Sequence, residues 1–258
     1  MIRVVKIGGN VIDDFLALER FCKDFASLDG PRVLVHGGGA LGSRMQERLG
    51  IEPVRIEGRR VTDAETLQVV TMVYAGWCNK KIVSLLQAEG CPAAGFSGCD
   101  GNIICAARRA PLEIGGKAVD FGYVGDVGKD SVNTRVLLGL ISMGLVPVLS
   151  PINHDGCGNL LNTNADTVAS AVASALGAEL TVCFEKPGVL RDVSDPGSVI
   201  PALDPVSYRA LKEEGRIADG MVPKLDNAFR SLREGTVRVT IKQASDLLDP
   251  GAGTVISL

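Results

Sequence analysis

Two clusters of glycines, each at the end of a short apolar segment, are candidates for binding phosphate. Residues 6–9 read KIGG and residues 36–39 read HGGG. Glycine lets the backbone approach a ligand closely, its N–H groups can point at phosphate oxygens, and a helix that begins there adds positive potential. One such cluster can be a simple turn, but two at neighbouring strand ends lie where parallel sheets bind ligands. We therefore predict phosphate binding by Gly8, Gly9, Gly37 and Gly38.

Three charged residues lie at positions where a charged side chain is expected to have a specific partner or function. Lys6 lies in an apolar segment, where an ammonium group must reach water at the strand end or meet an anion. Asp166 opens a helical pattern after two asparagines, a place where Asn and Asp usually cap the helix. Lys224 also begins a helical pattern, where the helix dipole disfavours a cation unless a ligand anion is near. Both lysines thus indicate that an anion binds nearby, and for Lys6 we predict that this anion is a phosphate being transferred.

The elements that position these residues alternate between short apolar segments and segments of helical period. The predicted strands, each with the helix that follows it, are 3–7 and 13–28, 32–36 and 41–49, 146–150 and 166–176, and 180–184 and 205–214. The strand segments are almost continuously apolar, as expected when helices cover both faces of a sheet. We predict an α/β fold, a three-layer αβα sandwich with a mainly parallel central sheet.

Two further segments differ from this alternation. Between 101 and 123 the pattern changes to short strands and turns, which predicts hairpins attached to the main sheet that form a substrate lid. Residues 64–88 form one long helical pattern, with Leu67, Val70, Tyr74 and Trp77 on one face. That face packs either into the core or against a second subunit.

Composition narrows the function to small-molecule chemistry. The 258 residues carry a net charge of -3 without a basic stripe, so nucleic acid is not an expected partner. The chain shows neither a signal peptide nor a membrane span, so no membrane partner is expected. Seven cysteines without a C-x-x-C pair suit reduced thiols in a cytoplasmic protein.

Other site classes fit the motifs less well. Gly37, Gly39 and Gly42 match the dinucleotide motif G-x-G-x-x-G with Glu57 about twenty residues on, but Glu57 lies in a charged stretch and does not end a strand. HGGG also resembles an esterase oxyanion loop, yet the chain has no G-x-S-x-G elbow. A Walker A loop is absent too, so nucleotide chemistry here requires another scaffold.

Taken in order, the motifs K-x-G-G, HGGG, GRRVT, NxNAD and DGMxxK resemble the amino acid kinase family, and within it the kinases that act on N-acetylglutamate. The resemblance covers nearly the whole chain. It implies ATP-dependent phosphorylation of the γ-carboxylate of N-acetyl-L-glutamate, giving N-acetyl-L-glutamyl 5-phosphate in arginine biosynthesis. It also implies an N-terminal lobe at 1–177 for acylglutamate binding and dimerisation, and a C-terminal lobe at 178–258 for ATP.

The same resemblance implies roles for individual residues. Lys6 and Lys224 would stabilise the transferring phosphoryl group, and Asp166 would orient both lysines. Gly38, Gly39, Arg60 and Asn162 would bind the substrate, with Arg60 pairing with a carboxylate, although by itself Arg60 reads as a solvated charge. ATP contacts are implied for Glu185, Lys186, Pro187, Gly188, Val189, Leu190, Arg216, Ile217 and Ala218. Mg²⁺ would be held mainly through the ATP phosphates, without a metal site of the protein's own.

Departures from the family pattern leave some expectations open. Residues 185–188 read EKPG in place of Asp-Val-x-Gly, and Cys99 stands where a basic residue is expected. The acyl group is therefore open between acetyl and succinyl, and kinases of carbamate, aspartate, glutamate or UMP are further alternatives. A regulatory protein that kept the fold and lost catalysis is another. Because no helical extension precedes the first strand, we expect an arginine-insensitive homodimer built on the 64–88 helix.

Overall fold

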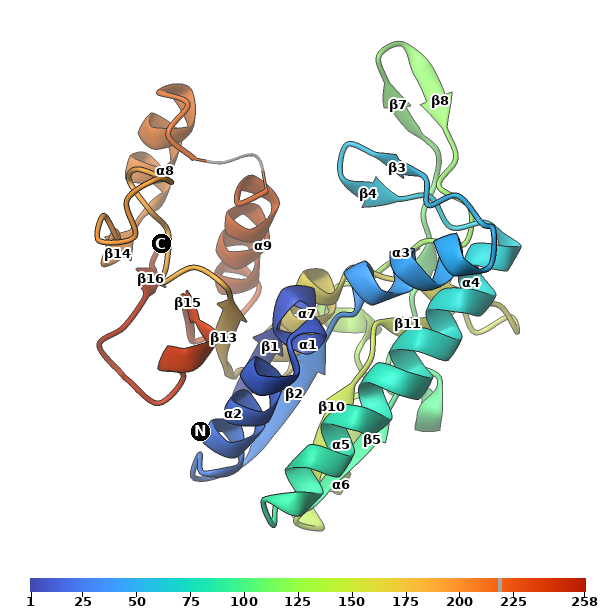
Figure 1. Ribbon diagram of the computed structural model, residues 1–258, viewed down its shortest axis with the longest axis horizontal. Helices are drawn as coiled ribbons and strands as arrows, with labels where there is room; N and C mark the ends of the chain where they lie inside the picture. Colours follow the sequence, from blue (N-terminus) through green and yellow to red (C-terminus); the bar gives the residue numbers. More distant parts are fainter. Residues whose placement is uncertain (218–219) are drawn as a thin grey trace.

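The centre of the molecule is an eight-stranded sheet (Figure 1). The computed structural model describes residues 1–217 and 220–258. The strand order is β14-β16-β15-β13-β1-β2-β10-β5, and only the β15–β16 pairing is antiparallel. The bounds are β1 (Arg3–Ile7), β2 (Arg32–His36), β5 (Ala93–Phe96), β10 (Val146–Leu149), β13 (Glu179–Phe184), β14 (Ala202–Leu203), β15 (Arg238–Gln243) and β16 (Thr254–Ile256). The predicted mainly parallel sheet is confirmed.

Helices cover both faces of this sheet and create two hydrophobic cores. Alternate residues of β1 enter different cores: Val4 packs with the helix α7 side, and Val5 and Ile7 with the α2 and α5 side. The helices are α1 (Gly9–Asp13), α2 (Phe15–Ala26), α3 (Gly39–Arg48), α4 (Ala64–Val70), α5 (Asn79–Ala88), α6 (Thr134–Ser142), α7 (Ala165–Leu176), α8 (Pro205–Glu213) and α9 (Val222–Arg233). The predicted three-layer α/β fold is therefore confirmed.

The helix predicted at 13–28 is confirmed as α2, which begins at Phe15, and the short helix α1 before it was not predicted. The backbone of Asp14 is extended, and its carboxylate accepts hydrogen bonds from the N–H groups of Leu16 and Ala17 at 3.0 and 3.1 Å. This cap begins α2 and ends α1. The short helix α1 can then start at Gly9, directly after the first strand.

The long helix predicted at 64–88 is continuous but changes its winding. Between α4 and α5 the chain forms a π-helix, η1 (Thr71–Cys78). The wider turns displace the following side chains, so that Cys78 is fully buried while Trp77 is 64% exposed. The prediction that Trp77 continues the buried face of Val70 and Tyr74 is thus wrong within the isolated chain. No helix in the described part of the chain is long and apolar enough to cross a membrane.

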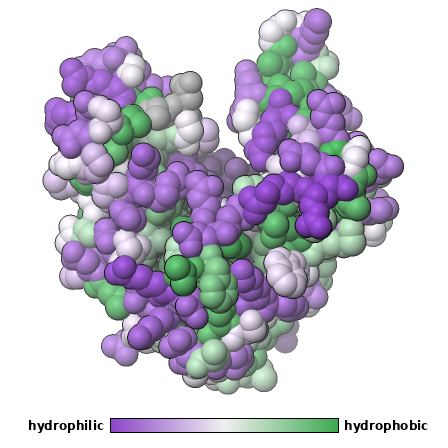
Figure 2. Space-filling view, viewed as in Figure 1, coloured by the Kyte–Doolittle hydropathy of each residue, from purple (hydrophilic) through white to green (hydrophobic). Residues whose placement is uncertain are grey.

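Among the described residues, four antiparallel strand pairs lie outside the main sheet. They are β3 (Arg55–Ile56) with β4 (Arg59–Arg60), β6 (Ala107–Arg108) with β9 (Gly125–Asp126), β7 (Leu112–Ile114) with β8 (Lys117–Val119), and β11 (Ile152–His154) with β12 (Leu160–Asn162). Each forms its own two-stranded sheet, so the expected attachment to the main sheet is wrong. In Figure 1 the β3–β4 and β7–β8 hairpins project opposite α8 and α9. Figure 2 shows the surface hollowed between these two projections.

Candidate active site

The two glycine clusters lie together at the carboxyl ends of β1 and β2. A Cβ placed on Gly9 would lie 3.5, 3.9 and 4.0 Å from the backbone nitrogens of Gly39, Ala40 and Gly38. The first N–H groups of an α-helix have no partner within the helix, and here the start of α3 carries them toward Gly9. The two loops thereby form a place for an anion. Gly8 instead donates its N–H to the Cys183 carbonyl at 3.0 Å, so it offers close approach rather than a donor.

Gly38 is required by both backbone conformation and space. Its φ is +154°, and an added Cβ would lie 2.8 Å from Tyr74 Cδ1 and 3.1 Å from Cys78 Sγ. Both neighbours belong to the π-helix, whose winding presents them to the loop. Gly37 faces the start of α7, where an added Cβ would lie 3.9 Å from the methyl group of Ala165. The loop is therefore seated between α3, α7 and the π-helix.

The three charged residues predicted to act on phosphate contact one another. Lys6 Nζ lies 2.5 Å from Asp166 Oδ1, and Lys224 Nζ donates a hydrogen bond to Asp166 Oδ2 at 3.0 Å. They come from β1, the first turn of α7 and the first turn of α9. The Asn164 side chain caps α7 by accepting from the N–H groups of Asp166 and Thr167, so that Asp166 itself is not the cap. The predicted cap is thus confirmed for Asn164 and wrong for Asp166, whose carboxylate is left to the lysines.

The two ion pairs keep the Asp166 carboxylate in its ionised form. Burial alone would raise the pKa of Asp166, but the positive charges of Lys6 and Lys224 outweigh it and hold the pKa well below its usual range. The side chains of Lys6 and Lys224 are 6% and 24% exposed. One carboxylate is thus shared by two ammonium groups, which leaves net positive charge beside the glycine loops.

The buried His36 side chain contacts the backbone of the HGGG loop at 36–39. It is fully buried, its Nδ1 lies 2.8 Å from the Gly37 carbonyl oxygen, and its Nε2 lies 3.0 Å from Asn79 Nδ2. The Asn79 amide nitrogen is a donor, so Nε2 accepts and Nδ1 carries the hydrogen. Burial lowers the pKa of His36 to about 4, which keeps the ring neutral. The ring therefore fixes the Gly37 peptide at the loop.

The residues predicted to bind substrate lie on the hairpin side of the hollow. Arg60, on β4, is 9% exposed and donates hydrogen bonds to the Gly39 carbonyl oxygen at 2.9 Å and to Ser43 Oγ at 2.7 Å. Asn162, on β12, donates from Nδ2 to Thr62 Oγ1 at 3.1 Å. Thr62 follows Arg60 closely, so the structure brings the GRRVT and NxNAD motifs together. The interpretation of Arg60 as a solvated charge is wrong.

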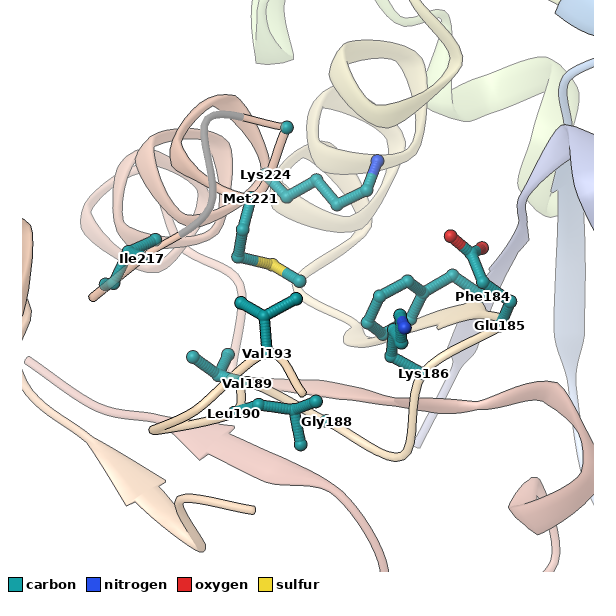
Figure 3. Close-up of a pocket in the computed structure, with 11 residues that line it drawn as sticks. Phe184, Glu185, Lys186, Gly188, Val189, Leu190, Val193, Ile217, Met221 and Lys224 are labelled. Atoms are coloured by element: carbon teal, nitrogen blue, oxygen red, sulfur yellow. The ribbon is translucent and has the colours of Figure 1, made fainter. Parts of the chain in front are cut away.

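A mostly apolar pocket of about 350 Å³ lies between β13 and α9 (Figure 3). Lys224 lines this pocket and contacts Asp166, so the pocket adjoins the charged cluster. The residues predicted to contact ATP that line it are Glu185, Lys186, Gly188, Val189, Leu190 and Ile217. The loop at 185–190 is held against β16, because the Val189 N–H donates a hydrogen bond to Thr254 Oγ1 at 2.9 Å.

Some of the expected nucleotide contacts are absent from this pocket, and others were missed. Pro187 is not among its lining residues, and Arg216 forms an ion pair with Glu214 at 2.9 Å. Ala218 lies outside the described residues. The sequence analysis missed Phe184, Val193 and Met221, which face the pocket in Figure 3. Their only signal is apolar character in loops and at element ends, which also fits core packing.

Comparison with known proteins assigns the chain to a family. The model of the amino acid kinase family matches residues 1–243. The acetylglutamate kinase of Cytophaga hutchinsonii is 49% identical over 250 residues, covering 95% of this chain and 92% of that protein. The acetylglutamate kinase of Phocaeicola vulgatus is 46% identical over 257 residues, covering 98% and 97%.

Solved structures share the fold. The N-acetylglutamate synthase of Neisseria gonorrhoeae superposes with a TM-score of 0.83 at 23% identity, covering all of this chain, which spans 59% of the length of that one. An isopentenyl phosphate kinase of T. acidophilum superposes with a TM-score of 0.65 at 14% identity over both full chains. These two likenesses concern the fold alone. The family model and the relatives above show that this chain belongs to the amino acid kinase family.

Proposed function

We propose that this chain is an acetylglutamate kinase, which transfers the γ-phosphoryl group of ATP to the γ-carboxylate of N-acetyl-L-glutamate. The product is N-acetyl-L-glutamyl 5-phosphate, a step of arginine biosynthesis. Relatives of that name are 42–49% identical over at least 95% of this chain. The observation that carries the proposal is the Lys6–Asp166–Lys224 cluster, which lies between the glycine loops and the apolar pocket.

The reaction needs positioning and charge stabilisation more than a protein nucleophile. A γ-carboxylate oxygen forms a bond to the γ-phosphorus, and the bond between that phosphorus and the β–γ bridging oxygen breaks, releasing ADP. The carboxylate is ionised at neutral pH, so no general base is required. Lys6 and Lys224 would offset the negative charge of the transferring group. N–H groups at Gly9, Gly38 and the start of α3 would hold its oxygens.

The apolar pocket suits the base of a nucleotide. Val189, Leu190, Ile217 and Met221 provide apolar walls, and Lys224 at the rim would reach the phosphates. Within residues 1–217 and 220–258, no group of three His, Cys, Asp or Glu side chains is arranged to hold a metal ion. Mg²⁺ is proposed to bind to the ATP phosphates, where it would screen their negative charge.

On the substrate side, Arg60 is the expected partner of a substrate carboxylate. Its guanidinium is buried and bonded to neutral groups, so an anionic ligand would complete its surroundings. Asn162 lies beside it through Thr62. We assign the substrate to a lobe at 1–177, with the hairpins as its lid, and ATP to a lobe at 178–258.

We further propose a cytoplasmic homodimer. Met72 and Trp77 are 60% and 64% exposed on the 64–88 helix, and burying them would favour association of two copies. Cys22, Cys78, Cys91 and Cys183 are buried free thiols, which suits a reducing compartment. Sedimentation of wild type and Trp77→Ser measures the dimer: we expect weaker association for the variant, and equal association would contradict this interface.

The assay that tests the activity measures ADP release together with hydroxylamine trapping of an acyl phosphate. N-acetyl-L-glutamate and N-succinyl-L-glutamate are offered side by side, because the phosphate site is indifferent to the acyl group. We expect preferred turnover of the acetyl substrate. Preference for the succinyl substrate would change the acyl group and keep the mechanism. Turnover of neither contradicts the proposal and directs attention to the other family substrates or to a non-catalytic role.

A further inference from the structure

The Arg60 guanidinium is a buried cation whose described partners are all neutral. It donates to the Gly39 carbonyl oxygen, to Ser43 Oγ and to Gln46 Oε1. None of the ion pairs among the described residues includes Arg60, and the ionisable groups that affect its pKa are the phenol of Tyr74, which raises it, and a second cation, Arg55, which lowers it. Burial lowers the pKa of Arg60, as expected for a cation without a counter-ion.

One face of α3 provides all three acceptors. Gly39, Ser43 and Gln46 are spaced four and three residues apart, so they form a stripe along one side of the helix. The same helix directs its first N–H groups toward Gly9. Helix α3 therefore joins the phosphate loop at its start to the Arg60 guanidinium along its side. Gln46 contacts Arg60 from the part of this stripe that is farthest from the loop.

The orientation of the Gln46 amide follows from its two partners. Gln46 is fully buried and its Nε2 lies 2.9 Å from Thr66 Oγ1. The Arg60 guanidinium has donors only, so the amide oxygen of Gln46 must accept from it, and the amide nitrogen donates to the Thr66 hydroxyl oxygen. A hydrogen-bonded chain therefore runs from Thr66 through Gln46 to the guanidinium.

We propose that Gln46 is a positioning residue of the substrate site, which orients Arg60 while leaving its positive charge for a carboxylate of the substrate. This inference rests on the proposed function. A glutamate at position 46 would make the same contact but would neutralise the guanidinium before substrate arrives. An amide has the shape and the acceptor that the site needs without this competing charge.

Gln46→Glu tests the charge and Gln46→Met tests the acceptor. Gln46→Glu should raise KM for N-acetyl-L-glutamate about tenfold or more, the order expected for a hydrogen bond to a charged group, with kcat and KM for ATP nearly unchanged. Gln46→Met keeps the volume and loses the acceptor, so its KM should rise less. Gln68→Glu is the control, because it adds the same charge on an exposed side of α4 and should leave KM unchanged.

A purely structural role of Gln46 predicts a different pattern, with lower thermal stability and lower kcat and no selective rise in KM. An unchanged KM for folded Gln46→Glu would also overturn the proposal. If Gln46→Glu does not fold, a wild-type KM for Gln46→Met would overturn it instead. Thermal-shift binding of N-acetyl-L-glutamate separates the two hypotheses. Wild type that binds it without turnover contradicts the kinase function, and Gln46 is then tested by the shift itself. Wild type that neither binds nor reacts contradicts both.

Discussion

At the scale of single residues, Asp166 decides how the two lysines are presented. Its carboxylate contacts Lys6 of β1 at 2.5 Å and Lys224 of α9 at 3.0 Å. Without a shared anion, two ammonium groups at this spacing would repel each other. The carboxylate therefore allows two cations to lie close together, where a polyanionic phosphoryl donor needs them.

Replacing Lys6 by Ala tests this arrangement. We expect kcat to fall about 10²–10³-fold, by analogy with the loss of one preorganised donor, while KM for both substrates changes little. Lys23→Ala is the matched control, because Lys23 is exposed on α2 and should have wild-type turnover. Steady-state kinetics with circular dichroism as a check on folding gives the answer. Near-normal kcat for folded Lys6→Ala would exclude Lys6 from the reaction.

At the scale of elements, α3 and the π-helix must approach closely for the HGGG loop to keep its shape. A Cβ on Gly42 would lie 2.9 Å from the Tyr74 hydroxyl oxygen and 3.0 Å from Tyr74 Cε1. The Tyr74 ring also limits the space at Gly38. The contact between these two helices thus defines where the N–H groups at the start of α3 point.

Gly42→Ala should destabilise the protein by about 1–3 kcal/mol, because the added methyl group overpacks this contact. Tyr74→Leu removes the hydroxyl and should relieve the clash, so the double variant should lose less than the sum of both single changes. Urea unfolding of the four proteins measures the coupling. Gly139→Ala on α6 is the control, since nothing lies within 4 Å of its added Cβ. Strict additivity would show that Gly42 and Tyr74 do not interact as described.

The sequence predicted the strands near the site well, and local winding poorly. The bounds of β1 and β2 were predicted to the residue because both segments are apolar and end at glycine. The π-helix was missed because a pattern of period 3.6 assumes constant winding, and Trp77 is exposed as a result. The helix α1 was missed because five residues are too few to show a helical period.

Site residues could be predicted from the sequence where a charged side chain lies in a segment that normally disfavours it. Lys6 in an apolar strand and Lys224 at a helix start carry such a signal, and the structure brings both to Asp166; their catalytic roles remain predictions. Phe184 and Met221 carry none, because apolar side chains that line a pocket look like core. The role of Gln46 could not be predicted from the sequence, because its contact with Arg60 depends on how α3 packs against the β3–β4 hairpin.

At the scale of the whole molecule, the buried His36 makes stability depend on pH. The pKa of His36 is about 4 in the folded chain and 6.5 for the ordinary side chain. Between these values the unfolded chain binds a proton that the folded chain does not, so stability falls as pH decreases. The stabilisation is complete above pH 6.5, and about 3 kcal/mol is lost by pH 4. The lowered pKa of Asp166 acts at lower pH, below the ordinary range of a carboxylate.

Urea unfolding at pH 7, 5.5 and 4.5 measures this dependence. His36→Asn should flatten it over the interval, whatever the variant's stability at pH 7. An equal slope for wild type and His36→Asn would show that another group is responsible.

The central claim is that a γ-carboxylate oxygen of the substrate attacks the γ-phosphorus of ATP at the Lys6–Asp166–Lys224 cluster. The most direct measurement is ³¹P NMR of the reaction with N-acetyl-L-glutamate labelled with ¹⁸O in its γ-carboxylate. We predict an acyl phosphate signal with the isotope shift of one ¹⁸O bonded to phosphorus, and its loss in Lys6→Ala. An acyl phosphate without the shift, or ADP formed without any acyl phosphate, would contradict the claim.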